Sequence, residues 1–376
     1  DVQSGGKYYV IRNSSSIIAF EMPKKDFGAF MICASHTDSP SFKLKPDFEI
    51  NADGCIKLSV EGYGGMIMSS WLDRPLSISG RIVTAKNGKV ETKLVNIDRD
   101  LLVIPSLAIH MSRDINKGYE FNIRRDMCPI ASEKNGRIED IIAENVGVDK
   151  EEILGFDLSL YNRMRGTVLG ADGEYFSAPR IDDLQCMYST LEGFLNSESD
   201  DNVNVFAAFD NEEVGSGTKQ GAKSSFLRDV LERICNNSET YKRAVAKSFM
   251  LSCDNAHAVH PNFADKSDGT NRVYMNGGIV IKYNANQRYT TDAVSEAVVK
   301  YVCKNAGVPY QMYANRSDIP GGSTLGNLSN EKVSLNTADI GLAQLAMHSS
   351  YETAGSRDTE YMVKMIKEFY KTEIVL

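Results

Sequence analysis

Short, continuous apolar runs alternate along the chain with segments of helical periodicity. The runs are bounded by glycine or polar residues, which is typical of strands buried on both faces of a sheet; they occupy residues 27–35, 203–209 and 249–253. Apolar residues spaced three and four positions apart predict three helices, within 184–195, 294–302 and 362–369. Strands that alternate with helices predict an α/β layer structure.

The stretch from about 40 to 168 has a different pattern. Two β-like arms flank Asn87-Gly88, the strongest short signal for a β-hairpin. Cys55–Val60 reads as a further strand, and apolar spacing over 138–146 indicates one short helix. We therefore predict a discontinuous α/β domain, residues 1–38 plus 169–376, interrupted by a β-rich insertion at 39–168.

Composition narrows the class of protein. The 376 residues are 42% hydrophobic and 24% charged, with a formal net charge of −8, as in ordinary globular proteins. The acidic balance argues against nucleic acid as a partner, and the apolar runs fall short of the ~20 residues that span a membrane. The seven cysteines are scattered and form no C-x-x-C pair, which is typical of a protein in a reducing compartment. The sequence also shows no charged-then-apolar leader pattern, so we expect a cytoplasmic protein. The sequence starts at Asp1 rather than methionine, so we expect that residues can precede it.

Acids and histidines gather where the predicted strands end. The segments are His36–Asp38, Arg180–Leu184, Asp210–Gly217, Ser252–Asn262 and Leu345–Thr353. Each has a plain structural interpretation when taken alone: a helix N-cap, a surface loop or a packed histidine. Asp210, Glu212 and Glu213 are harder to explain in this way, because clustered carboxylates at a buried strand end repel one another. A divalent cation removes that conflict.

The combined donor set predicts a metal site. In open α/β sheets, ligands bind outside the carboxyl ends of the strands. Carboxylates and imidazoles without a thiolate cluster suit two zinc ions that share a bridging carboxylate.

These segments closely resemble the motifs of the aspartyl aminopeptidase and vacuolar aminopeptidase I family of dinuclear zinc metallopeptidases. The matching stretches are His36-Thr-Asp, Arg180-Ile-Asp-Asp-Leu, Asp210-Asn-Glu-Glu-Val-Gly-Ser, Asp254-Asn-Ala-His-Ala-Val-His-Pro-Asn and Leu345-Ala-Met-His-Ser. The resemblance implies a zinc-exopeptidase-like α/β/α catalytic domain with an inserted β-rich dimerisation domain. It also implies that dimers build a dodecamer around the active sites.

The resemblance implies a role for each position. His36 and Asp254 would hold one zinc ion, Glu213 and His348 the other, and Asp182 would bridge them, with cobalt or manganese as alternative metals. Asp38 would orient His36, and Glu212 would be the general base on the water between the ions. Asp183 stands where some relatives have asparagine, and its effect is unassigned.

Four further positions are candidates for substrate binding. His110 would reach into the site of a neighbouring subunit, and Lys282 would face the pocket for an acidic first residue. Gly322 and Ser323 lie in a glycine turn that lets a substrate approach the backbone. Each has a plain alternative: a packed or surface histidine, a lysine paired with a structural carboxylate, and an ordinary turn. His257 and His260 are expected to orient their loop by hydrogen bonding.

The leading hypothesis is an aminopeptidase that removes the N-terminal residue of peptides, with a preference for Asp or Glu. Alternatives are a preference for neutral residues, an N-acyl amino acid amidohydrolase, and a non-catalytic assembly or cargo protein. The adjacency of Glu212 to Glu213 argues against the last of these, because a structural metal site needs only one of them.

Overall fold

The computed structural model describes residues 2–86, 88–133, 136–198, 201–235 and 237–375. The chain divides into two compact units. The first comprises Asp1–Ser39, Thr167–Met347 and Glu352–Leu376; the second comprises Pro40–Gly166 and His348–Tyr351.

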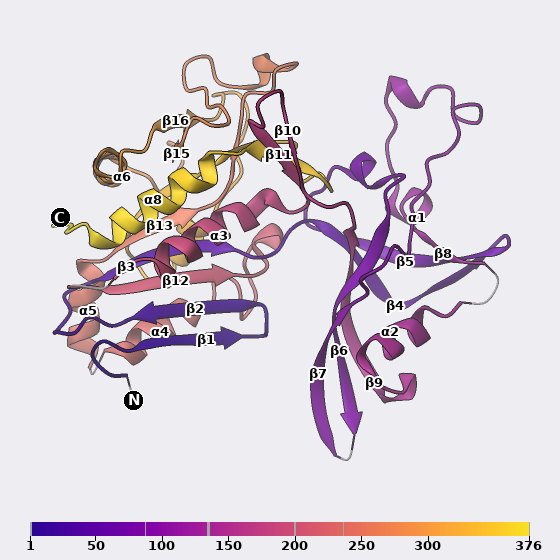
Figure 1. Cartoon of the computed structure of the whole chain (residues 1–376), viewed down its shortest axis with the longest axis horizontal. Helices are drawn as coiled ribbons and strands as arrows, with labels where there is room; N and C mark the ends of the chain where they lie inside the picture. Colours follow the sequence, from indigo (N-terminus) through magenta and orange to yellow (C-terminus); the bar gives the residue numbers. More distant parts are fainter. Residues whose placement is uncertain (1, 87, 134–135, 199–200, 236, 376) are drawn as a thin grey trace. The chain divides into compact units, whose positions relative to one another are not determined.

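An eight-stranded sheet forms the centre of the first unit, in the order β1-β2-β12-β3-β13-β17-β15-β16 (Figure 1). Its strands are β1 (Lys7–Arg12), β2 (Ser16–Glu21), β3 (Phe30–His36), β12 (Val203–Phe209), β13 (Phe249–Cys253), β15 (Ile279–Tyr283), β16 (Tyr310–Ala314) and β17 (Asn336–Gly341). β3 is parallel to both of its neighbours, β12 and β13. The strands predicted at 203–209 and 249–253 are confirmed. The first predicted run begins three residues too early, because pairing with β12 starts only at Phe30.

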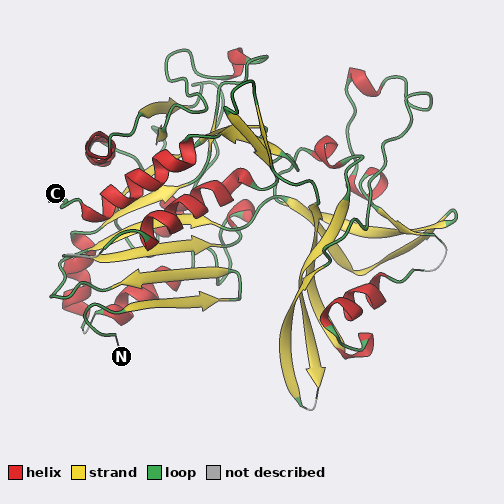
Figure 2. Ribbon diagram, viewed as in Figure 1, coloured by secondary structure: helices red, strands yellow, loops and turns green. Residues whose placement is uncertain are grey.

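Helices cover both faces of this sheet (Figure 2). One core contains residues of α3 (Ile181–Leu195), α6 (Ala293–Ala306) and α8 (Asp358–Lys371); the other contains residues of α4 (Phe226–Ile234), α5 (Ser238–Ala246) and α7 (Leu325–Ser329). Along β3, Met31 and Cys33 belong to the first core, and Phe30, Ile32 and Ala34 to the second. Burial on both faces explains the unbroken apolar runs. The three predicted helices are confirmed as α3, α6 and α8.

A smaller five-stranded sheet completes the first unit, in the order β10-β11-β19-β18-β14. Its strands are β10 (Thr167–Leu169), β11 (Tyr175–Ala178), β14 (Ala256–His257), β18 (Ala343–Leu345) and β19 (Glu352–Gly355). Short 3₁₀ helices occur at Glu212–Val214 and Ala264–Lys266.

The second unit is built on a six-stranded antiparallel sheet, in the order β7-β6-β9-β4-β5-β8. Its elements are β4 (Ser41–Ala52), β5 (Cys55–Tyr63), β6 (Leu76–Lys86), β7 (Lys89–Asn96), β8 (Ile130–Ser132), β9 (Ile153–Asn162), α1 (Ile123–Asp126) and α2 (Ile138–Val146), with 3₁₀ helices at Met68–Trp71, Ile115–Lys117 and Lys150–Glu152. The predicted hairpin is β6–β7, which closes at the pair Lys86–Lys89. Asn87 of its turn lies outside the described residues. The predicted strand and short helix are β5 and α2.

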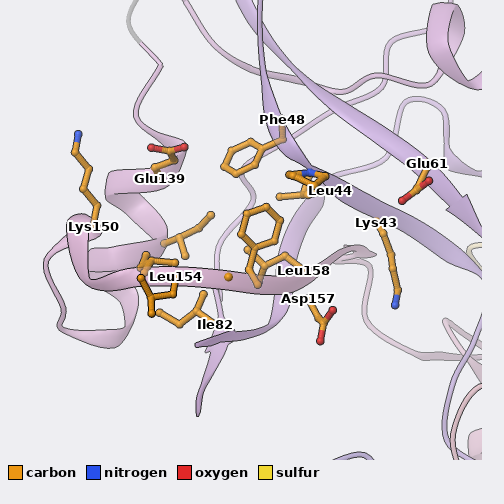
Figure 3. Close-up of a pocket in the computed structure, with 15 residues that line it drawn as sticks. Lys43, Leu44, Phe48, Glu61, Ile82, Glu139, Lys150, Leu154, Asp157 and Leu158 are labelled. Atoms are coloured by element: carbon orange, nitrogen blue, oxygen red, sulfur yellow. The ribbon is translucent and has the colours of Figure 1, made fainter. Parts of the chain in front are cut away.

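A cavity of about 550 Å³ lies within this second unit (Figure 3). Phe48, Leu44 and Leu158 provide apolar lining, while Lys150 and Glu139 are among its charged residues. None of the predicted site residues lines it.

No helix in the described part of the chain is long and apolar enough to cross a membrane.

Candidate metal centre and active site

Two neighbouring strands bring the first candidate ligands together. β3 ends at His36, and Asp254 directly follows β13, its parallel neighbour (Figure 1). Asp182 and Asp183 lie in the first turn of α3. One potential ligand atom from each of these four residues lies within 4.8 Å of the others, and all four residues are buried. In the first unit, the ends of two strands and the start of a helix therefore bring one imidazole and three carboxylates together.

The two ring nitrogens of His36 face different acids. Nε2 lies 3.4 Å from Asp182 Oδ1. Nδ1 lies 3.1 Å from the backbone oxygen of Asp38 and 3.4 Å from its Oδ1. With Nδ1 directed at Asp38, Nε2 is the nitrogen that would be available to a metal shared with Asp182.

Asp38 also holds the turn that carries the two adjacent glutamates. Its Oδ1 accepts a hydrogen bond from Glu212 N and its Oδ2 one from Glu213 N, both at 3.1 Å. The backbone enters this turn through Asn211, which has a left-handed conformation with φ of 64°. Asp38 thus connects the end of β3 with the end of β12. The sequence pointed to its contact with His36 but offered no signal for this second task.

Burial and mutual repulsion shift the proton affinities of the clustered acids. Burial is the main cause that raises the pKa of Asp183 and Asp254. Burial, followed by the charge of Asp254, raises the pKa of Glu212 to about 7. Burial alone would lower the pKa of His36, but hydrogen bonds to Asp182 and Asp38 raise it well above its usual range.

These shifts fit a site for a divalent cation. A cation among the carboxylates replaces their protons and offsets their repulsion. One imidazole and several carboxylate oxygens form a donor set that zinc accepts. The residues of the first unit therefore fit a zinc site.

Lys282 lies inside the protein beside one of these candidate ligands. Its Nζ donates a hydrogen bond to Asn255 O at 2.8 Å and lies 3.7 Å from Asp254 Oδ1. Burial is the largest single influence and acts to lower the pKa of the ammonium, but the charge of Asp254, together with smaller contributions from Tyr289 and Asp339, raises the pKa overall. Of the two interpretations of Lys282, these contacts match pairing with a carboxylate rather than binding of an acidic substrate. The carboxylate belongs to Asp254, which is a predicted metal ligand.

The remaining predicted residues lie in several places. His348 belongs to the second unit, where its Nδ1 lies 2.6 Å from Gly65 O, and His110 is exposed in that unit. In the first unit, Gly322 lines a cavity of about 340 Å³ together with His257, His260, Lys266 and Arg316. Ser323 donates to Asn327 Oδ1 at 3.2 Å. His260 Nδ1 accepts a hydrogen bond from Asn262 N at 3.2 Å, as expected for a residue that orders its loop.

A network of buried hydrogen bonds holds the backbone of Asp182 in place, and it was not predicted from the sequence. Asp182 N donates to Glu352 Oε2 at 3.0 Å, and Gln344 Nε2 donates to Glu352 Oε1 at 3.3 Å. Asn255 Nδ2 donates to Gln344 Oε1 at 2.7 Å. Neutral amides and a single acid at strand ends do not stand out in a sequence, and only the fold brings them together.

Comparison with known proteins shows the family to which the chain belongs. Residues 1–370 match the family described as aminopeptidase I zinc metalloprotease (M18). M18 family aminopeptidase 2 of Clostridium acetobutylicum is 45% identical over 388 residues, covering 98% of this chain and 89% of the relative. The Pseudomonas aeruginosa protein of the same name is 38% identical over 378 residues, with 98% and 88% covered.

Solved structures give the same answer. Ape4, from its complex with Nbr1, superposes with a TM-score of 0.95 at 35% identity, covering all of this chain and 79% of Ape4. The mApe1 dodecamer of S. cerevisiae has a TM-score of 0.85 at 29% identity, covering 98% and 86%. The motifs, the fold and the buried donor set thus lead to one conclusion: this chain belongs to the M18 family and is a zinc-dependent aminopeptidase.

Proposed function

We propose that the chain removes the N-terminal residue of peptides with two zinc ions per chain. His36 and Asp254 hold one ion, Glu213 and His348 the other, and Asp182 bridges the two. The observation that carries the proposal is the buried cluster of His36 and the aspartates in the first unit. The roles of Glu213 and His348 rest on the family resemblance.

In this proposal Glu212 moves the proton. Bound zinc polarises the scissile carbonyl and lowers the pKa of water. Glu212, adjacent to the proposed ligand Glu213, can accept a proton from the attacking water and return it to the leaving amine. Asp38 supports this step, because its hydrogen bond to Glu212 N fixes the backbone from which the carboxylate extends.

The test of this function is a panel of aminoacyl-anilides assayed with the purified protein, with its metal content measured in parallel. We expect hydrolysis of substrates with a free α-amino group and two equivalents of metal. Turnover restricted to N-acyl amino acids would favour the amidohydrolase. Bound metal without turnover of either class would favour the assembly or cargo protein.

We further propose a preference for N-terminal Asp or Glu, with Lys282 as its determinant. The support for Lys282 is the resemblance to aspartyl aminopeptidases alone, because the 340 Å³ cavity next to the Asp254 loop is lined by Lys266 and Arg316 but not by Lys282. A neutral substrate would not form the ion pair that an acidic first residue makes with the Lys282 ammonium, and this difference is on the order of 100-fold in rate. A preference for neutral residues is the alternative within the same family.

Lys282→Met is therefore expected to lower the ratio of Glu-anilide to Leu-anilide turnover by about 100-fold. Zinc content must be measured as well, because Lys282 also contacts Asp254. Lys300→Met is the control, since this lysine pairs with Glu296 on the outside of α6. The assignment fails if the wild type already prefers Leu, or if the variant leaves the ratio unchanged.

We also propose that the second unit is a dimerisation domain and that dimers assemble into a dodecamer. The solved mApe1 of S. cerevisiae is described as a dodecamer, which supports the proposal. Exposed apolar side chains on either side of His110, Ile109 and Met111, are available for a contact between subunits. The seven free cysteines agree with the reducing environment of the cytoplasm, where we place the protein.

If His110 completes the site of a neighbouring subunit, His110→Ala should reduce kcat/KM without loss of zinc. Light scattering should give the mass of a dimer or of a larger even-numbered assembly up to twelve chains. A fully active monomer would contradict both the assembly and the role of His110.

A further inference from the structure

Asp183 lies between the ends of two strands. It is fully buried. Its Oδ2 accepts a hydrogen bond from His36 N, and its Oδ1 accepts one from Asn255 N, both at 3.2 Å. One carboxylate therefore contacts the backbone of β3 and the backbone that follows β13.

Asp183 makes these two contacts just beyond the point where β3 and β13 stop pairing with each other. The β3–β13 ladder ends at the pair Ala34–Ser252. Beyond it, buried N–H groups still need acceptors, and Asp183 supplies one oxygen to each side. The amides it holds belong to His36 itself and to the residue next to Asp254. The carboxylate thus sets the spacing of two ligand-bearing segments where the sheet no longer does so.

We propose that Asp183 is a positioning residue that holds His36 and Asp254 at the separation required by one zinc ion, and is not itself a ligand. The inference rests on the proposed function, because it concerns the ion that those two residues bind. Asp183 lies close enough to the other three residues to be considered a ligand. However, both of its oxygens accept backbone N–H groups, whereas Asp182 presents Oδ1 to His36 Nε2.

The test is Asp183→Asn, which keeps the shape of the side chain but leaves only one oxygen. Its amide N–H groups would then face a backbone N–H group, so one of the two anchors is lost. We expect zinc affinity, measured by competition with a chelator, to fall by about 10- to 100-fold, the usual effect of losing a group that orients a ligand. At saturating cobalt, the visible absorption spectrum should match that of the wild type, because the ligands themselves are unchanged.

Asp358→Asn is a closely matched control. Asp358 is also fully buried and also accepts two backbone N–H groups, from Asn276 at 2.6 Å and Gly278 at 2.9 Å. These belong to the turn before β15 rather than to the predicted ligands. Thermal unfolding of the metal-free proteins should show a loss of stability in both variants, while zinc affinity in Asp358→Asn should stay within about twofold of the wild type.

Each outcome decides the matter. Wild-type zinc affinity in Asp183→Asn, or an equal loss in both variants, would overturn the positioning role, and an altered cobalt spectrum would make Asp183 a ligand instead. If the asparagine variant does not fold, Asp183→Ser removes both anchors without placing an amide against the backbone and should weaken zinc binding in the same way. A wild-type protein that binds no zinc would refute the proposed function as well, whereas normal zinc affinity in the variants refutes only the role of Asp183.

Discussion

Replacing Glu212 with glutamine should lower kcat by at least about 100-fold while zinc remains bound, the usual effect of removing a general base. Glutamine has nearly the same shape as glutamate but cannot accept a proton at neutral pH. The anchor at its backbone is retained, because Asp38 binds Glu212 N rather than the side chain. Steady-state kinetics combined with elemental analysis would measure both halves of this expectation.

Glu331→Gln provides the control for a change of charge alone, since Glu331 is an exposed acid that lies near Lys223. It should retain wild-type kcat. Near-normal turnover by Glu212→Gln would show that another group carries the proton.

Replacing Asp182 with alanine is expected to have a still larger effect, the loss of both zinc ions and with them of activity. A bridging carboxylate serves each ion, so its removal weakens both sites at once. The Asp183→Asn variant is the informative comparison, because at saturating zinc it should still fill both sites. Metal analysis that finds two full equivalents in Asp182→Ala would disprove the bridging role.

Much of this fold could be predicted from the sequence, because the positions of apolar residues along the chain match the positions that are buried in the strands and helices. β12 and β13 have the bounds that their apolar runs predict, and α6 ends before Gly307, which takes the left-handed conformation typical of a helix C-terminus. The start of β3 was less clear, because partner strands rather than composition decide where pairing begins. The hairpin signal at Asn87-Gly88 correctly located the β6–β7 pair, although Asn87 itself lies outside the described residues.

The residue types of the candidate site were predictable from the sequence, but the hydrogen bonds that connect these residues were not. Charged groups at strand ends indicated His36, Asp182 and Asp254. The residues that hold these candidate ligands in place were not predicted. Asp183 accepts backbone N–H groups just beyond the point where the β3–β13 pairing ends, and that point is not visible in the sequence. Glu352 accepts the backbone N–H of Asp182, and only the fold brings these two residues together. Lys282 shows the same limit: pairing with a carboxylate was one of its two interpretations, but only the fold identifies that carboxylate as Asp254.

The strand order has a consequence for when this peptidase can first become active. β3 carries His36 near the start of the chain, yet its partners β12 and β13 are synthesised far later, on the other side of the insertion. Pairings between such distant segments form slowly and only once both are present. A partly synthesised chain therefore contains His36 without the framework that holds it against Asp254. The growing polypeptide has no assembled peptidase site until β13 and Asp254 have been added, so hydrolytic activity requires the segments on both sides of the insertion.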